Sequence, residues 1–129
     1  MAEIGIRKKT AMTYEQALEK LPELLKAEGF GVLTQIDVKE TLKAKIGVDF
    51  RKYRILGACN PKFAHQALGK VLEVGVLLPC NVVVYEGDDG KAVVIAVDPM
   101  QTLAAARPEL APVAGEVRTR LARAIAGLA

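Results

Sequence analysis

Residues 80–86 read CNVVVYE, residues 91–98 read KAVVIAVD, and Gly87-Asp88-Asp89-Gly90 lies between them. The flanking stretches are rich in β-branched and aromatic residues, while glycine and aspartate are typical of tight turns. This combination predicts a β-hairpin. If Glu86 pairs with Lys91, Cys80 faces Val97 and Pro79 faces Asp98.

Both faces of this hairpin are apolar. In the predicted register one face carries Val82, Val84, Val93, Ile95 and Val97, and the other carries Val83, Tyr85, Ala92, Val94 and Ala96. Each face therefore needs cover, since exposed apolar surface costs about 25 cal/mol per Å². Three main helices are expected to cover one face well and the other poorly, so we predict a homodimer that buries the second face. The alternative is that the chain's own helices divide between the two faces.

The remaining segments predict the other elements in chain order. Residues 3–9 indicate an edge strand, Thr13 with Gln16 forms a capping box that opens a helix, and residues 30–38 alternate as a second strand. A short helix to Ile46, a strand over 53–59 and a helix from Asn60-Pro61 precede the hairpin. A short helix and a long C-terminal helix follow it. The 129 residues thus predict one α+β domain, residues 1–129, with a mostly antiparallel sheet packed by helices.

Composition narrows the classes of function. The chain is 51% hydrophobic, yet no apolar run approaches the ~20 residues of a membrane span. The start, Met1 to Thr10, lacks the apolar stretch of a secretory signal, so a cytoplasmic protein without a membrane partner is expected. The sequence has no serine and one histidine, which excludes serine-nucleophile hydrolases and multi-histidine metal sites within one chain.

The net charge of +3 is concentrated between Asp37 and Arg54. This segment holds Lys39, Lys43, Lys45, Arg51, Lys52 and Arg54. A solvated helix face with its loop explains it better than a nucleic-acid interface, because no aromatic stacking platform accompanies the basic residues.

Two Cys-Asn pairs stand at predicted strand ends. Cys59-Asn60-Pro61 ends one strand and opens a helix, and Pro79-Cys80-Asn81 starts the next strand. The helix between them allows either a parallel crossover or an antiparallel return. An antiparallel return brings both thiols to one rim beside Asp98 and the helix start, whereas a parallel crossover separates them by ~20 Å.

For the antiparallel case we predict a ligand site at this rim, formed by Cys59, Asn60, His65, Cys80, Asn81 and Asp98. Cys59 and Cys80 are also candidate metal ligands, but their spacing with His65 is not that of a closed zinc site, so a second chain or open positions would complete it. Buried cysteines that only pack, and asparagine and aspartate that only cap helices, remain the simpler explanation.

Two stretches, Tyr53–Pro61 (YRILGACNP) and Leu77–Glu86 (LLPCNVVVYE), resemble the motifs of a known family. Residues 29–45 (GFGVLTQIDVKETLKAK) and Val97-Asp98-Pro99 support them. From Thr13 onward the chain resembles the bacterial family of domain of unknown function 302, and most closely its compact members from thermophiles. The resemblance implies an α+β fold laid out like the TATA-binding protein and a dimer, but it implies no established activity, and any cofactor stays unknown. Nor does the likeness of fold argue for DNA binding.

The sequence favours a homodimeric domain that binds or senses a small ligand or metal at Cys59 and Cys80. The alternative is a thiol-dependent enzyme in which Cys59 attacks an electrophile, with Cys80 resolving the adduct or His65 acting as base. Nucleic-acid binding through Lys39–Arg54 ranks last. The identity of the ligand, and whether there is catalysis, stay open.

Overall fold

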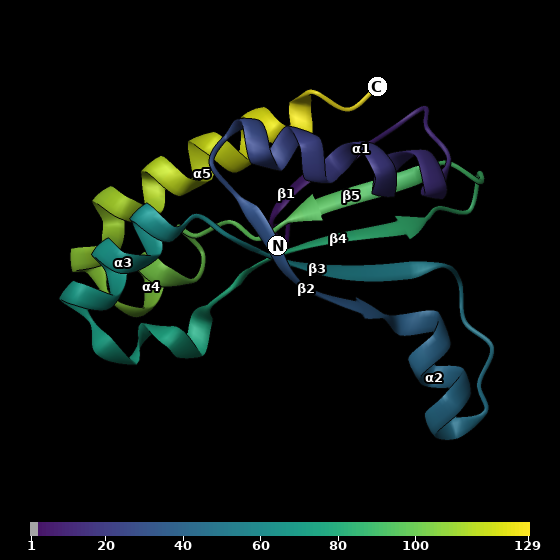
Figure 1. The fold of residues 1–129 in the computed structure, drawn as a ribbon, viewed down its shortest axis with the longest axis horizontal. Helices are drawn as coiled ribbons and strands as arrows, with labels where there is room; N and C mark the ends of the chain where they lie inside the picture. The colour runs from purple at the N-terminus through teal and green to yellow at the C-terminus, as the bar shows by residue number, and fades with distance from the viewer. Residues whose placement is uncertain (1–2) are drawn as a thin grey trace.

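The computed structural model describes residues 3–129 and builds one sheet from five strands, in the order β1-β5-β4-β3-β2 (Figure 1). Every neighbouring pair is antiparallel, so the predicted α+β class with an antiparallel sheet is confirmed. The strands are β1 (Ile6–Lys9), β2 (Gly31–Asp37), β3 (Tyr53–Cys59), β4 (Cys80–Glu86) and β5 (Ala92–Ala96). The helices are α1 (Tyr14–Ala27), α2 (Val38–Ile46), α3 (Pro61–Lys70), α4 (Leu103–Ala106) and α5 (Ala111–Ala126), with 3₁₀ turns η1 (Leu72–Leu77) and η2 (Pro108–Leu110).

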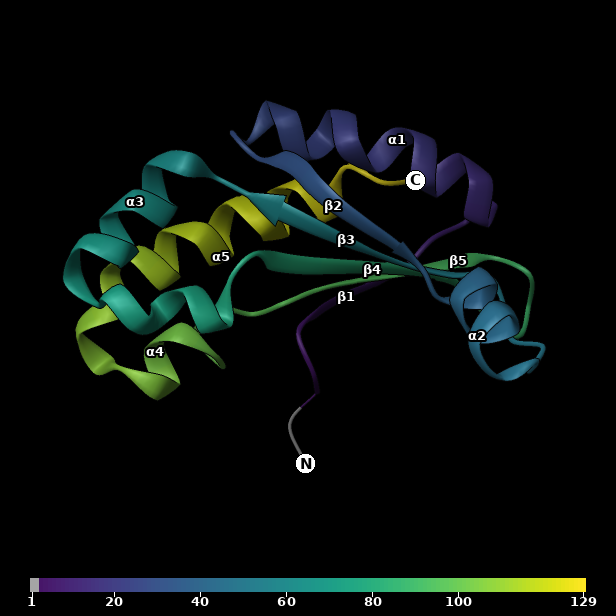
Figure 2. The ribbon, with the colours of Figure 1, turned by 60° about the horizontal axis from the view of Figure 1, so that its bottom comes forward.

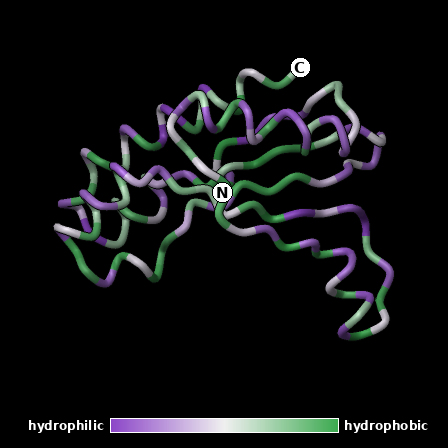
Figure 3. The backbone as a smooth tube through the Cα atoms, in the orientation of Figure 1, coloured by the Kyte–Doolittle hydropathy of each residue, from purple (hydrophilic) through white to green (hydrophobic). Residues whose placement is uncertain are grey.

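Helices α1 and α5 lie together on one face of the sheet (Figure 2). Helix α1 begins where the sequence predicts, because the Thr13 hydroxyl accepts from the Gln16 N–H at 3.1 Å and the Gln16 side chain accepts from the Thr13 N–H at 2.9 Å. Apolar side chains from both helices pack onto the central strands, where the hydrophobic residues concentrate (Figure 3). None of the helices in residues 3–129 is long and apolar enough to cross a membrane.

The hairpin forms, but the predicted register is wrong by one residue. Glu86 pairs with Ala92 rather than with Lys91, so five residues form the loop instead of four. Within this loop the Gly87 N–H donates to the Lys91 carbonyl at 2.8 Å, and Gly90 adopts a φ of +81° that favours glycine. The sequence shows a turn-rich tetrapeptide but does not show that Lys91 belongs to the loop.

A slip of one residue exchanges the two faces of β5 relative to β4. The face under the helices carries Val82, Val84, Ala92, Val94 and Ala96, all of them buried. The opposite face carries Tyr53, Ile55, Val83, Tyr85, Val93 and Ile95, and we call it the open face.

No helix within residues 3–129 lies across the open face (Figure 2). The helices therefore do not divide between the two faces, which was the alternative to a homodimer. The rings of Tyr53 and Tyr85 stack on this face, with centroids 5.4 Å apart and planes inclined by 6°. Helix α2 projects beyond the strand ends, buries none of its residues and ends at Gly47, which has a left-handed φ of +68° (Figure 1).

Candidate functional site

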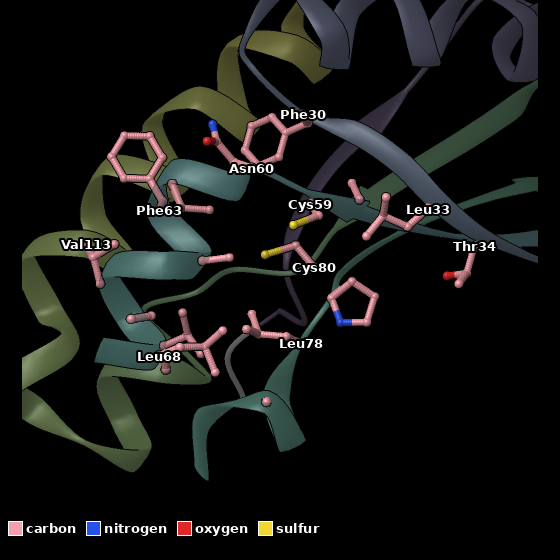
Figure 4. A pocket seen from close by; sticks show the side chains of 17 residues that line it. Phe30, Leu33, Thr34, Cys59, Asn60, Phe63, Leu68, Leu78, Cys80 and Val113 are labelled. Carbon is pink, nitrogen blue, oxygen red and sulfur yellow. The ribbon is translucent and has the colours of Figure 1, made fainter. Parts of the chain in front are cut away.

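Strand β4 pairs antiparallel with β3, which is the condition for bringing both thiols to one rim. Ala58 lies directly opposite Cys80, so Cys59 and Cys80 come to the same end of the sheet. Both cysteines are free thiols, and both line one cavity, where Figure 4 shows their sulfur atoms close together.

This cavity has a volume of about 380 Å³, and we call it the thiol cavity. It lies between the ends of β2, β3 and β4 and the elements α3, η1, α4 and α5 (Figures 1 and 4). Its lining contains no Asp, Glu, Lys, Arg or His among residues 3–129. The lining residues are Phe30, Leu33, Thr34, Ala58, Cys59, Asn60, Phe63, Ala64, Ala67, Leu68, Gly75, Leu78, Pro79, Cys80, Leu103, Val113 and Val117.

Small side chains on α3 are one reason that this space stays hollow. Phe63, Ala64, Ala67 and Leu68 recur at helical spacing and turn one face of α3 toward the cavity. Two of the four are alanines, and Gly75 contributes no side chain from η1. A larger residue at position 64 or 67 would occupy space that is now empty.

The two thiols differ in their surroundings. Cys80 is 9% exposed, and burial followed by the nearby charge of Cys59 raises the pKa of its thiol to about 11. Cys59 is only half-buried. The lining supplies neither of them with a cationic partner or a general base from residues 3–129, which are the groups that activate a thiol as a nucleophile.

Asn60 forms part of the wall of the thiol cavity and joins two segments. It occupies the N-cap position of α3 as predicted, but its side chain makes no capping hydrogen bond. Instead, Nδ2 donates to the Glu28 carbonyl at 3.3 Å, and Asn60 is 9% exposed. Gly29 at the neighbouring turn has a φ of +90°, and a Cβ there would lie 2.9 Å from Asn60 Nδ2. Asn60 therefore holds the entry of β2 against the start of α3.

Three of the six predicted site residues lie outside the thiol cavity. Asn81 is exposed on the opposite side of the sheet, and His65 is exposed on α3 without reaching the lining. Asp98 is buried, but its Oδ1 accepts from the Met100 N–H at 2.9 Å and its Oδ2 accepts from Arg118 Nε at 3.0 Å. The structure thus brings together Cys59, Asn60 and Cys80 and assigns Asp98 to a turn and an ion pair.

No group of three or more His, Cys, Asp or Glu side chains within residues 3–129 is arranged to hold a metal ion. Two thiols alone offer an incomplete set for zinc, which takes four ligands in structural sites. A metal at Cys59 and Cys80 would therefore need further ligands from outside this chain or from solvent.

Sequence reasoning missed the apolar walls. Phe30 before β2, Leu33 of β2, Leu78 after η1, and Val113 and Val117 of α5 line the thiol cavity but look like ordinary apolar packing residues in the sequence. One signal could have indicated a hollow: Ala64 and Ala67 repeat on the apolar face of a helix that is otherwise lined by large residues.

Most cations of the basic segment, residues 37–54, form hydrogen bonds or ion pairs with other groups of the same chain. Five of its six cations have a partner: Lys39 with the Phe50 carbonyl at 2.7 Å, Lys43 with Asp49 at 3.2 Å, Arg51 with Asp88 at 3.1 Å, Lys52 with Glu15 at 2.7 Å and Arg54 with Asp37 at 3.1 Å. Three aromatic rings, those of Phe50, Tyr53 and Tyr85, do lie beside it, contrary to expectation. The two tyrosine rings stack on each other, however, and the ion pairs support the interpretation of a solvated face.

Comparison with known proteins places the whole fold in one family. A model of the family described as "Domain of unknown function DUF302" matches residues 6–128. The solved structure of an uncharacterised conserved DUF302 protein from Bacillus stearothermophilus is 36% identical, with a TM-score of 0.86, and the similarity covers 95% of this chain and 96% of that one. No curated protein matches the chain.

Proposed function

The chain belongs to the DUF302 family, and we propose that it binds an uncharged, largely apolar small molecule in the thiol cavity. One observation carries the proposal: a space of about 380 Å³ at the strand ends is lined by apolar side chains and by no charged one within residues 3–129. This volume falls within the range of roughly 300–1,000 Å³ found for small-molecule sites, which are typically apolar with a few polar groups.

The lining also limits the chemistry of the ligand. A carboxylate or ammonium group in this cavity would lose its hydration without gaining a charged partner, which costs several kcal/mol in order of magnitude. Asn60, Thr34 and the two thiols are the polar groups of the lining, and they can orient a hydroxyl, carbonyl or sulfur atom. Aromatic or branched aliphatic ligands fit this pattern, because Phe30 and Phe63 offer flat apolar walls.

The other candidate functions have less support at this site. Metal binding needs ligands beyond Cys59 and Cys80, and catalysis by an activated thiol needs a base or cation that the lining does not supply. An apolar ligand needs neither of these, so it fits the residues of the lining as they are.

We further propose that two copies pair through the open face. This face presents apolar and aromatic side chains from β3, β4 and β5 with no helix of residues 3–129 across it, and its burial would be favourable at about 25 cal/mol per Å². In a two-fold pair each copy would cover the open face of the other. Strands β3 and β4 contribute both to this face and, through Cys59 and Cys80, to the thiol cavity, so ligand binding and pairing share the same strands.

A cavity-filling substitution tests ligand binding. In Ala64→Phe the new ring should occupy the thiol cavity, and we expect the dissociation constant of an uncharged apolar probe, N-phenylnaphthylamine, to rise at least tenfold. Gln66→Phe adds the same ring to the exposed side of the same helix and serves as the matched control. Fluorescence titration of the three proteins gives the constants, and their melting temperatures show that all are folded.

Equal affinity of the probe for Ala64→Phe and for the wild type would contradict the proposal, as would the absence of any saturable binding to the wild type. Equal loss of affinity in both variants would also contradict it, because the effect would then not depend on the cavity.

A further inference from the structure

We propose that Cys59 and Cys80 form a dithiol pair that exchanges with small uncharged disulfides: Cys59 is the thiol that reacts first, and Cys80 is the thiol that resolves the adduct. This activity goes beyond the proposed function and does not depend on it, since it needs only two neighbouring thiols and a path to one of them. The product is an intramolecular disulfide between the end of β3 and the start of β4.

The sheet register places the two residues within bonding reach. Ala58 lies opposite Cys80, so Cys59 is the diagonal neighbour of Cys80 on the adjacent strand. Opposite Cα atoms in antiparallel pairs are roughly 4.5–5.5 Å apart, and an offset of one residue adds a rise of about 3.3 Å, which gives a diagonal of about 6 Å. This lies inside the range of about 4.4–6.8 Å for disulfides.

Side-chain direction supports the same pairing. Cys59 is the last residue of β3, next to the start of α3. Both side chains line the thiol cavity, and Figure 4 shows the sulfur atoms close together.

Accessibility assigns the two roles. Cys59 is half-buried, whereas Cys80 is 9% exposed and lies deeper in the packing. An incoming disulfide therefore meets Cys59 first. The apolar and uncharged lining favours an uncharged reagent over a charged one such as glutathione disulfide.

The exchange balances without any further oxidant. The Cys59 thiolate attacks one sulfur of the reagent RS–SR, a Cys59–SR bond forms, the S–S bond of the reagent breaks, and RS⁻ leaves and takes up a proton. Cys80 then loses its proton to water, its thiolate attacks the sulfur of Cys59, and a second RS⁻ leaves. In total one reagent disulfide is reduced to two RSH while two protein thiols are oxidised to one disulfide.

The second step should depend strongly on pH. Burial raises the pKa of the Cys80 thiol to about 11, so its thiolate fraction, and hence the rate of resolution, should rise about tenfold per pH unit below that value. Cys59 is the only titratable group of residues 3–129 that shares the lining with Cys80. The nearby carboxylate Asp98 is paired with Arg118 outside the cavity.

The test uses the full reduced chain and hydroxyethyl disulfide, followed by intact-mass measurement and peptide mapping. For the wild type we expect a transient mixed disulfide on Cys59 and then a protein lighter by two hydrogens, with the second step at least tenfold faster at pH 9 than at pH 7. Cys80→Ala should stop at the mixed disulfide, and Cys59→Ala should react at least tenfold more slowly than the wild type.

The proposal is overturned if the wild type ends with both cysteines carrying the reagent, remains reduced, or forms only disulfides between chains. Equal rates for Cys59→Ala and the wild type would also overturn the assignment of roles. Should either variant fail to fold, peptide mapping of the wild type alone decides between these outcomes. Probe binding by the reduced protein is measured separately, so failure of the exchange is distinguishable from failure of the proposed ligand site.

Discussion

Val83→Lys is expected to dissociate the proposed homodimer into monomers. Val83 lies at the centre of the open face, paired with Ile55 on one side and Ile95 on the other. In the proposed dimer each copy would bury an ammonium group without a partner, at a cost of about 3–5 kcal/mol, and the two-fold symmetry doubles that cost. Since 1.4 kcal/mol corresponds to a factor of ten, the dissociation constant should rise at least 100-fold.

Sedimentation equilibrium measures this effect directly, with 13.8 kDa as the mass of a single chain. Thr119→Lys is the matched control, because Thr119 is exposed on the outer surface of α5 and its lysine should leave the dimer intact. A wild-type protein that sediments as a monomer at micromolar concentration would refute the pairing, and so would a Val83→Lys variant with the dissociation constant of the wild type.

The second large effect concerns stability at alkaline pH. The pKa of Cys80 is raised from 9.0 to about 11 in the folded protein, chiefly by burial. The folded state therefore keeps the proton while the unfolded state releases it, and the stability present below pH 9 is lost as the pH rises through 11. Two pKa units correspond to about 2–3 kcal/mol, which the wild type should lose over this range and Cys80→Ala should not.

Urea unfolding of the reduced proteins at intervals from pH 8 to pH 11.5 measures the difference. Tyrosine and lysine side chains also titrate in this range, Tyr14 with a pKa raised mainly by burial, but they are common to both proteins and cancel in the comparison. Parallel stability curves for the two proteins would show that Cys80 is not buried as the structure has it.

The main outline of the fold follows from local patterns. The capping box at Thr13, the turn at residues 87–90 and the Asn60-Pro61 helix start each lie where the sequence predicts an element. Local patterns do not determine the pairing register, because it depends on whether Lys91 belongs to the strand or to the loop. That single residue decides which side of β5 faces the helices.

The candidate site was only partly predictable, for a different reason. From the sequence, Cys59 and Cys80 come to the same rim only if β4 runs antiparallel to β3. The arrangement of the strands in the sheet decides this, and the hairpin pattern does not. Asp98 was predicted to belong to the ligand site, but it is buried outside the thiol cavity, and its partner Arg118 is 20 positions away and leaves no local signal. The hollow itself arises from missing side-chain volume at Ala64, Ala67 and Gly75, which only the packed structure brings together.

The thiol cavity is proposed to hold a small apolar molecule in contact with Cys59 and Cys80, which both line it. Alkylation of Cys59 by iodoacetamide, measured in a Cys80→Ala background so that only one thiol reacts, tests this occupancy. At a concentration of N-phenylnaphthylamine that saturates its fluorescence, the rate of alkylation should fall at least tenfold, because the bound molecule covers Cys59. An unchanged rate at saturation would place the bound probe elsewhere and exclude the thiol cavity as its binding site.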